Sequence, residues 1–320
     1  MARLLMIVAP LCLTAGNACT PSAPQDHHAA PSWESGGDGY LDPPGQGACY
    51  FIDRFALNQT GAEIDLTGDG EPDATLNHAF ARELEYFNLQ LNNLIESGRY
   101  LSMIEVAGLG LPYAGEDDAV TLKFYPCHDA DADIANNACL EPGCGHMLAD
   151  PDFMIDGQSL YRTAPAPLRD HRVLGQLSAT LYIKISDHAL PIRRTTFDLR
   201  LPADLGVITD SLMCGAATAH GLDLIPLCHL FPDPCPPFIP PDMTMAVTLA
   251  ERGYQPDVDL DGDGLETFDT DPATYEVVSC RDGDGAVIAG AGCLHDGRVA
   301  DGYSVCFDQH AVPGQLDYSP

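Results

Sequence analysis

The segment DVDLDGDGLETF, residues 257–268, constrains this chain most, because it places aspartates on four alternate positions, 257, 259, 261 and 263. At about 6 Å separation and an effective dielectric near 20, each pair of neighbouring carboxylates repels by about 2 to 3 kcal/mol. A folded chain keeps such a segment only if solvent or a cation offsets that repulsion. Gly264 permits a tight bend, so we expect a loop that encloses a hard divalent cation.

Counted from Asp259, the segment has the odd-position spacing of a calcium loop. Its expected ligands are Asp259, Asp261, Asp263, the carbonyl of Leu265, and Asp269. Position 9 is Thr267, a weaker ligand than aspartate, and Glu266 or Asp271 could complete the ligand set instead. Asp282 and Asp284 follow as half of another such unit that could share ligands with this loop. The alternative is an acidic turn that binds no metal.

A second acidic loop, DLTGDGEPD at residues 65–73, repeats the pattern near the other end of the chain. Its expected ligands are Asp65, Thr67, Asp69, the carbonyl of Glu71, and Asp73. Neither loop is an EF-hand, because the position of the bidentate glutamate holds Leu76 in one and Thr270 in the other. Several oxygen ligands in a loop favour Ca²⁺ over Mg²⁺, which demands strict octahedral geometry and keeps its waters.

The overall charge excludes nucleic acid as a partner. Asp and Glu number 47 against 15 Lys and Arg, a formal net charge of -32, so a phosphate backbone would be repelled. The 320 residues are 45% hydrophobic, which is enough apolar material for one large or two modest cores and is not a disordered composition.

The N-terminal segment predicts export. Residues 1–18 read as a signal peptide, with Arg3 before an apolar run and small residues at its end. Cys19 follows as a lipidation site, and residues 19–47 are a Pro-, Gly- and Ser-rich linker. The protein is therefore expected to be exported, either anchored in an outer membrane by lipid or freely secreted. A membrane-spanning helix needs about 20 apolar residues, and no later stretch approaches that length.

Cysteines support the same compartment. The chain has 12, and ten remain after Cys12 and Cys19 are set aside, an even number that predicts up to five disulfides. Local pairs are expected within 127–144, 214–235 and 280–306, with Cys228 and Cys235 stapling a Pro-rich run. A zinc site is the alternative for one cluster: Cys127, His128, Cys139, Cys144 and His146.

Periodicity predicts an α+β fold, with an antiparallel β-rich sheet or sandwich and one strong amphipathic helix. The helix carries an apolar stripe: Leu76, Phe80, Leu84, Phe87, Leu91 and Leu94. Residues 171–186 alternate apolar and polar as a strand, and 193–202 should be its antiparallel partner. The Gly/Ala-rich segment 206–222 suggests a packed helix. We expect an α+β domain at 48–254 and a disulfide-bounded calcium-loop tail at 255–320.

The loops are similar to those of FG-GAP, thrombospondin type 3 and dockerin-like proteins. The whole layout resembles uncharacterised secreted lipoproteins of myxobacteria, a likeness that implies a Gram-negative surface but no activity. Motifs for serine hydrolases, zinc proteases and P-loops are absent from the sequence, so a non-enzymatic role is favoured and enzymatic activity stays open.

We therefore expect an exported calcium-binding lipoprotein of the cell envelope with a structural or adhesive role. The alternatives are a secreted hydrolase with structural calcium and a glycan-binding module. The expected partners are calcium and a cell-surface protein or glycan, with membrane contact through the lipid anchor alone and no nucleic acid.

Overall fold

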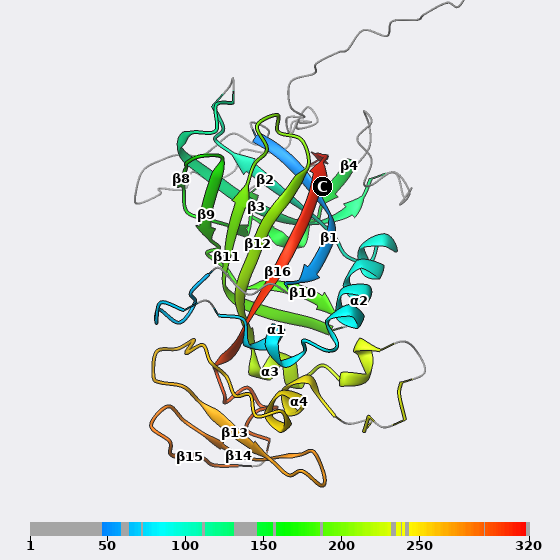
Figure 1. The fold of residues 1–320 in the computed structure, drawn as a ribbon, viewed down its shortest axis with the longest axis vertical. Helices are drawn as coiled ribbons and strands as arrows, with labels where there is room; N and C mark the ends of the chain where they lie inside the picture. The colour runs from blue at the N-terminus through cyan, green and yellow to red at the C-terminus, as the bar shows by residue number, and fades with distance from the viewer. Residues whose placement is uncertain are drawn as a thin grey trace, which may run out of the picture.

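The computed structural model describes residues 47–58, 64–71, 73–110, 113–130, 146–155, 158–185, 188–231, 235–237, 239–240, 243–290 and 292–317. The predicted signal peptide, Cys19 and all of the predicted linker except Gly47 lie outside these residues. The described part is β-rich: a 12-stranded, mostly antiparallel curled sheet stands above a small three-stranded sheet, with few short helices (Figure 1).

The large sheet has the strand order β10-β11-β12-β16-β1-β2-β3-β4-β17. Its strands along that path are β1 (Gly47–Leu57), β2 (Leu101–Ala107), β3 (Asp117–Asp129), β4 (His146–Ala149), β10 (Leu181–Ile185), β11 (His188–Arg200), β12 (Ile208–Thr218), β16 (Gly302–Pro313) and β17 (Gln315–Asp317). Off the path, β7 (Tyr161–Arg162) and β8 (Ala166–Leu168) pair with β3, and β9 (Arg172–Gln176) pairs with β11. The β17·β4 pair is parallel, so the predicted antiparallel sheet is in fact mixed.

The large sheet curls back on itself and encloses the core. β8 pairs with β3 and β9 pairs with β11, while a bridge between Arg169 and Arg172 joins β8 to β9. Apolar side chains on the inner face are buried, as the rings of Phe124 and Phe197 show by stacking 6.2 Å apart. A short two-stranded ribbon, β5 (Met154–Ile155) and β6 (Gln158–Ser159), follows the 3₁₀ turn η2 (Pro151–Phe153).

The predicted amphipathic helix forms, divided into α1 (Thr75–Ala79) and α2 (Leu84–Glu96). All six residues of its apolar stripe are buried, and Phe80 and Phe87 pack edge to face across the break, with ring centroids 5.0 Å apart. Two asparagines fix α2 on β1: the Asn88 and Asn92 side chains accept hydrogen bonds from the N–H groups of Leu57 and Phe55.

The predicted strand at 171–186 is two strands, β9 and β10. β9 pairs antiparallel with residues 196–200 of β11, within the predicted partner segment 193–202, whereas β10 pairs with residues 188–192, which precede that segment. The predicted helix at 206–222 is wrong for most of its length, since it is strand β12 followed by the short helix α3 (Ala219–Asp223). Its small residues serve close strand packing: a Cβ on Gly215 would lie 2.5 Å from a methyl carbon of Ile192.

The small sheet has the order β13 (Thr267–Thr270), β14 (Val277–Arg281), β15 (Val287–Ile288). The turn η3 (Leu227–Leu230) precedes α4 (Met245–Glu251), and α3 and α4 lie between the two sheets in Figure 1. The predicted tail at 255–320 thus supplies the small sheet and also β16, which lies between β12 and β1 in the large sheet. The predicted domain division at 254/255 stays a prediction.

Three disulfides are present among the described residues: Cys214–Cys306, Cys228–Cys235 and Cys280–Cys293. The last two are the expected local pairs, whereas Cys214 pairs across 92 residues of sequence because β12 and β16 lie side by side. Cys49 is disulfide-bonded as well, and Cys127 is a buried free thiol.

Candidate metal centre

The N-terminal acidic loop closes around the first of its aspartates. The Asp65 carboxylate accepts hydrogen bonds from the N–H groups of Gly68 (2.5 Å) and Gly70 (2.8 Å). Both glycines have positive φ, 84° and 91°, a conformation that residues with a Cβ rarely adopt. These N–H groups lower the pKa of Asp65, Gly70 contributing most, and so keep the carboxylate ionised.

The C-terminal loop repeats this conformation residue for residue. Asp259 accepts hydrogen bonds from Gly262 (2.6 Å) and Gly264 (3.0 Å), whose φ angles are 88° and 107°. The N–H of Gly262 is the main reason that the pKa of Asp259 is lowered. The two segments read DLTGDG and DLDGDG, so the same sequence pattern forms the same turn near both ends of the described chain.

A further aspartate completes each loop, but it comes from a different place. In the first loop, Asp73 accepts hydrogen bonds from the N–H groups of Leu66 (2.6 Å) and Thr67 (2.9 Å). In the second loop, Asp301 accepts from the N–H of Leu260 (2.8 Å), the residue equivalent to Leu66. Asp301 thus takes the role of Asp73, although it lies far along the chain, directly before β16.

Three carboxylates meet in the second loop. Asp259, Asp261 and Asp301 each bring an oxygen to within 4.8 Å of the others, and they are the acidic group of the described residues that can hold a metal ion. Asp261 is exposed and Asp301 is fully buried, so an ion at this point would lie between solvent and the protein interior. Asp301 was not among the predicted ligands. It supplies the carboxylate that Thr267 at position 9 cannot.

Glu266 fixes the buried side of this group. Its carboxylate accepts hydrogen bonds from the N–H groups of Ala300 and Asp301, and its own N–H donates to the Asp301 carboxylate at 2.8 Å. Burial raises the pKa of both Glu266 and Asp301, and the charges of Asp259 and Asp261 raise that of Asp301 further. A cation here would offset the same repulsion and favour the ionised carboxylates.

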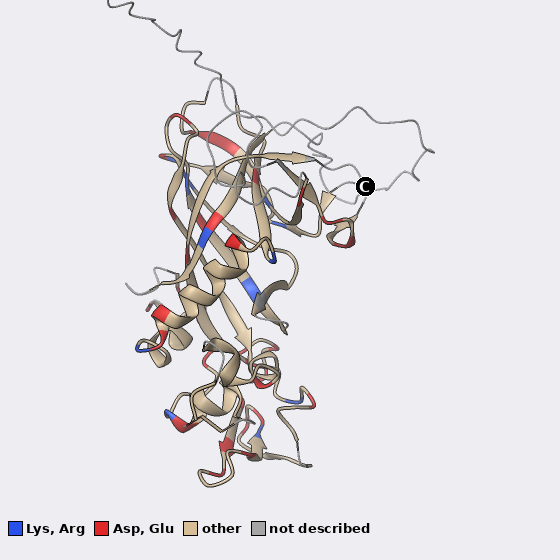
Figure 2. Ribbon diagram, turned by 90° about the vertical axis from the view of Figure 1, so that its right-hand side faces the viewer, with Lys and Arg blue, Asp and Glu red and all other residues tan. Residues whose placement is uncertain are grey.

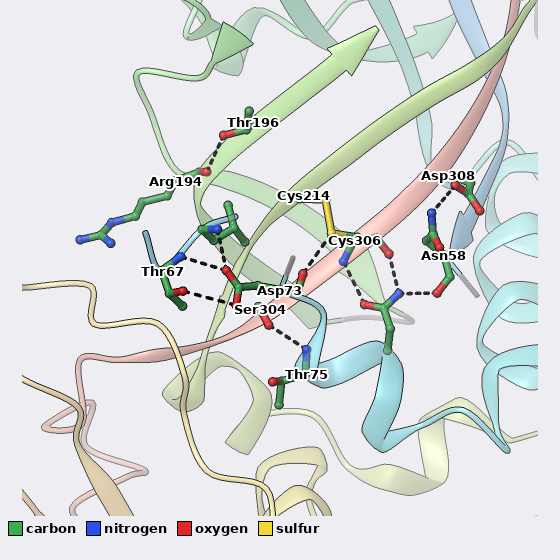
Figure 3. Close-up of a disulfide and its surroundings, with 12 residues drawn as sticks. Asn58, Thr67, Asp73, Thr75, Arg194, Thr196, Cys214, Ser304, Cys306 and Asp308 are labelled. Carbon is green, nitrogen blue, oxygen red and sulfur yellow. Dashed lines mark hydrogen bonds between the residues drawn. A yellow bond between two sulfur atoms is a disulfide. The ribbon is translucent and has the colours of Figure 1, made fainter. Parts of the chain in front are cut away.

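In the first loop, the equivalent of Asp261 is Thr67. Its hydroxyl lies 3.4 Å from an Asp65 oxygen and 3.5 Å from an Asp73 oxygen, so the three side chains converge. Figure 3 shows the contact between Thr67 and Asp73. Of the other two predicted ligands, the Asp69 carboxylate accepts a hydrogen bond from the N–H of Glu71 at 2.9 Å, and the role of the Glu71 carbonyl stays a prediction.

The remaining predicted ligands of the second loop differ in their contacts. A hydrogen bond with Asp261 is the main reason that the pKa of Asp263 is raised. Asp269 lies on β13, where its carboxylate accepts a hydrogen bond from Ser279 at 2.8 Å. The role of the Leu265 carbonyl stays a prediction. The Asp282 turn packs against the loop, because a Cβ on Gly283 would lie 2.3 Å from the Asp263 carbonyl oxygen.

Both loops are attached to the same strand, β16. The Ser304 hydroxyl accepts a hydrogen bond from the N–H of Thr75 at 2.7 Å (Figure 3). Thr75 lies two residues after Asp73 of the first loop. The Ser304 hydroxyl and N–H donate to Asp257, at 2.5 and 2.8 Å, two residues before Asp259. A single serine therefore joins the end of one loop to the beginning of the other.

Comparison with family models, curated proteins and solved structures found no match for this chain. The disulfides indicate an extracellular or otherwise oxidising compartment. None of the helices in the described residues has the length and apolar character required to span a membrane. Two cysteines of the alternative zinc site, Cys139 and Cys144, lie outside the described residues.

Proposed function

We propose that this protein is an exported calcium-binding protein of the cell envelope with a structural role. The observation that carries the proposal is the convergence of Asp259, Asp261 and Asp301, one of them fully buried, within 4.8 Å of one another. A fold that gathers carboxylates at this density is stabilised by a divalent cation, since their mutual repulsion otherwise opposes folding.

Calcium suits the group better than other common ions. The three side chains offer only oxygen, which excludes the soft ligands that zinc and copper prefer. The site lies on a loop open to solvent on one side, which allows water to complete a shell of six to eight oxygens. By analogy of conformation, we extend the proposal to the first loop, where Asp65, Thr67 and Asp73 would bind a second ion.

The proposed role follows from what the ligands connect. Asp259 and Asp261 precede the small sheet, while Asp301 directly precedes β16 of the large sheet. An ion held by all three would cross-link these segments and stabilise the attachment of the small sheet. The predicted lipid anchor at Cys19 and the resemblance to myxobacterial lipoproteins support a cell-surface location for the protein.

Thermal unfolding in calcium, magnesium or chelator tests the proposal. Calcium at about 100 times its dissociation constant stabilises a one-site protein by about 2.7 kcal/mol, which raises the midpoint of a chain this size by about 4 to 5 °C. Magnesium should give a much smaller shift. An unchanged midpoint in calcium, together with no calcium binding by calorimetry, would refute the proposal.

Matched variants locate the effect. Asp261→Asn alters an exposed ligand and should leave the fold intact while it removes most of the shift due to the second loop. Glu276→Gln changes an exposed acid between β13 and β14, outside the predicted ligands, and should leave the calcium shift unchanged. If the two variants lose the shift equally, calcium is acting through general charge screening rather than at the three carboxylates.

A further inference from the structure

A groove on the outer face of the large sheet is lined almost entirely by polar side chains. It has a volume of about 500 Å³, within the range of small-ligand sites. Of its 11 lining residues, Leu212 is the apolar one, and three are arginines: Arg54, Arg172 and Arg200. The groove crosses β9, β11, β12, β16 and β1, so residues distant in sequence form one surface.

Strand register places these residues on the outside. Asp198 pairs with Leu212, and Leu212 pairs with Asp308, in a row across three strands. The row immediately beside it, Phe197, Met213 and Phe307, is buried in the core. Because successive residues of a strand face opposite sides, the charged row faces out.

The charge of the groove differs from that of the whole protein. It holds three of the chain's 15 basic residues and three of its 47 acidic ones, Asp198, Asp210 and Asp308. Acidic residues lie on the large sheet as well as on the loops around the small sheet (Figure 2). A negative ligand would meet less repulsion at this groove, where basic and acidic residues are equal in number, than the net charge of the whole chain implies.

The three arginines differ in the ion pairs that they already form. Asp198 holds Arg172 in a two-pronged ion pair, with Nε 2.6 Å from Oδ1. Arg200 lies 3.7 Å from Asp210, and both side chains are exposed, so this pair is weak. Arg54 is exposed, and among the described residues its charge attracts Asp308 without forming an ion pair or side-chain hydrogen bond. Two guanidinium groups can therefore bind a carboxylate on a ligand.

The groove continues into a second hollow of about 280 Å³ that shares Arg200, Thr209 and Asp210 with it. The hairpin turn at Asp170 and His171 lines its far end, and both residues have positive φ, 47° and 64°. Positive φ at both residues is the ordinary conformation of a two-residue hairpin turn, here closed by the Arg169–Arg172 bridge. Two joined hollows fit an extended ligand better than a single small ion.

We propose that this groove binds an acidic oligosaccharide, whose carboxylates pair with Arg54 and Arg200 and whose hydroxyls donate to the lining aspartates. A ligand with both features is required, because the groove offers guanidinium donors and carboxylate acceptors in equal number. The site is separate from the calcium loops and does not depend on the proposed calcium function.

Calorimetry with a hyaluronan hexasaccharide, which carries glucuronates, tests the proposal against a chitin hexasaccharide, which is of equal length and has no carboxylate. The acidic sugar should bind at least about tenfold more tightly, and its affinity should fall as salt rises. Titrations in calcium and in chelator should agree, which separates this site from the metal loops. No binding of the acidic sugar, or equal binding of both sugars, overturns the proposal.

Variants test which residues bind the sugar. Arg54→Gln and Arg200→Gln should each weaken binding by about tenfold, the size expected for one charged hydrogen-bonding partner. Arg193→Gln, an exposed arginine on the same strand as Arg200 and outside the groove, is the matched control and should have no effect. Asp210→Asn should strengthen binding, because it frees Arg200. Equal affinity of the Arg54, Arg200 and Arg193 variants would overturn the assignment.

Discussion

Asp257 is the first of the four alternating aspartates, yet its carboxylate accepts hydrogen bonds from Ser304 of β16 and is not part of the three-carboxylate group. Burial raises its pKa, the hydrogen bonds from Ser304 oppose that rise, and the charge of Asp73 adds to it. The side chain thus belongs to the link between the two loops. An alternating pattern of aspartates does not by itself reveal which of them face an ion and which face the protein.

The raised pKa of Asp257 predicts a pH dependence. In the folded protein its protonated form is favoured, so its contribution to stability is complete below the ordinary aspartate pKa of about 3.9 and is lost as pH rises through the raised value. Asp257→Asn removes this titration. In chelator, the unfolding midpoint of the variant should therefore fall less than that of the wild type between about pH 4 and pH 7.

The control for this prediction is Glu96→Gln, which changes an exposed acid at the end of α2. Its midpoint should follow the wild type across the same pH range. Parallel curves for the wild type and the Asp257 variant would show that burial of this carboxyl has no energetic consequence.

At the scale of the element, the helix α1 is tied to β16 by one buried amide. The Asn77 side chain donates to the carbonyls of Asn58 and Cys306, at 2.8 and 2.7 Å, and accepts the N–H of Cys306 at 2.9 Å. Asn77 is 3% exposed, so water cannot replace it. Asn77→Ala should cost about 2 to 4 kcal/mol, because it leaves buried backbone groups of β16 unpaired.

Urea unfolding measures this cost, with Asn93→Ala on the exposed face of α2 as the matched control. The control should change stability by no more than about 0.5 kcal/mol. A loss of similar size in both variants would mean that helix propensity, and not the buried amide, determines the effect.

The elements also show where sequence patterns suffice. The apolar stripe of the helix and the alternation at 171–186 correctly predicted which faces are buried, because each element packs one face against a single core, although the structure divides each segment into two elements. β12 was mistaken for a helix, because its small residues, including Gly215, reflect close contact with β11 and not helical periodicity. No sequence pattern pointed to Asn77, because its hydrogen-bond partners are Cys306 of β16 and Asn58 directly after β1.

At the scale of the whole molecule, both loop turns could be predicted from DLTGDG and DLDGDG, but the complete site could not. Asp301 lies beyond the small sheet in sequence, and only the pairing of β16 with β12 and β1 fixes the strand that it precedes. The bridge between Val258 and Gly302 then brings the two segments together. Such a ligand carries no local spacing by which to recognise it.

The link through Ser304 predicts how calcium should act on the whole molecule. Hydrogen exchange should slow in both acidic loops and at the amides of Thr75 and Ser304, while β9 and β10 at the far side of the sheet should not change. Asp261→Asn should abolish the protection of the second loop and keep that of the first. Protection confined to residues 259–266 would contradict the proposed coupling through β16.

The Cys214–Cys306 disulfide should keep the protein in one piece after proteolytic cleavage. It spans the Pro-rich run, the small sheet and the second acidic loop, since all of these lie between its two cysteines. A single cleavage anywhere in that interval leaves two fragments that are still covalently joined, at neighbouring strands in the middle of the sheet. The two fragments of a cleaved molecule would therefore separate only after a reductant had reduced the buried disulfide.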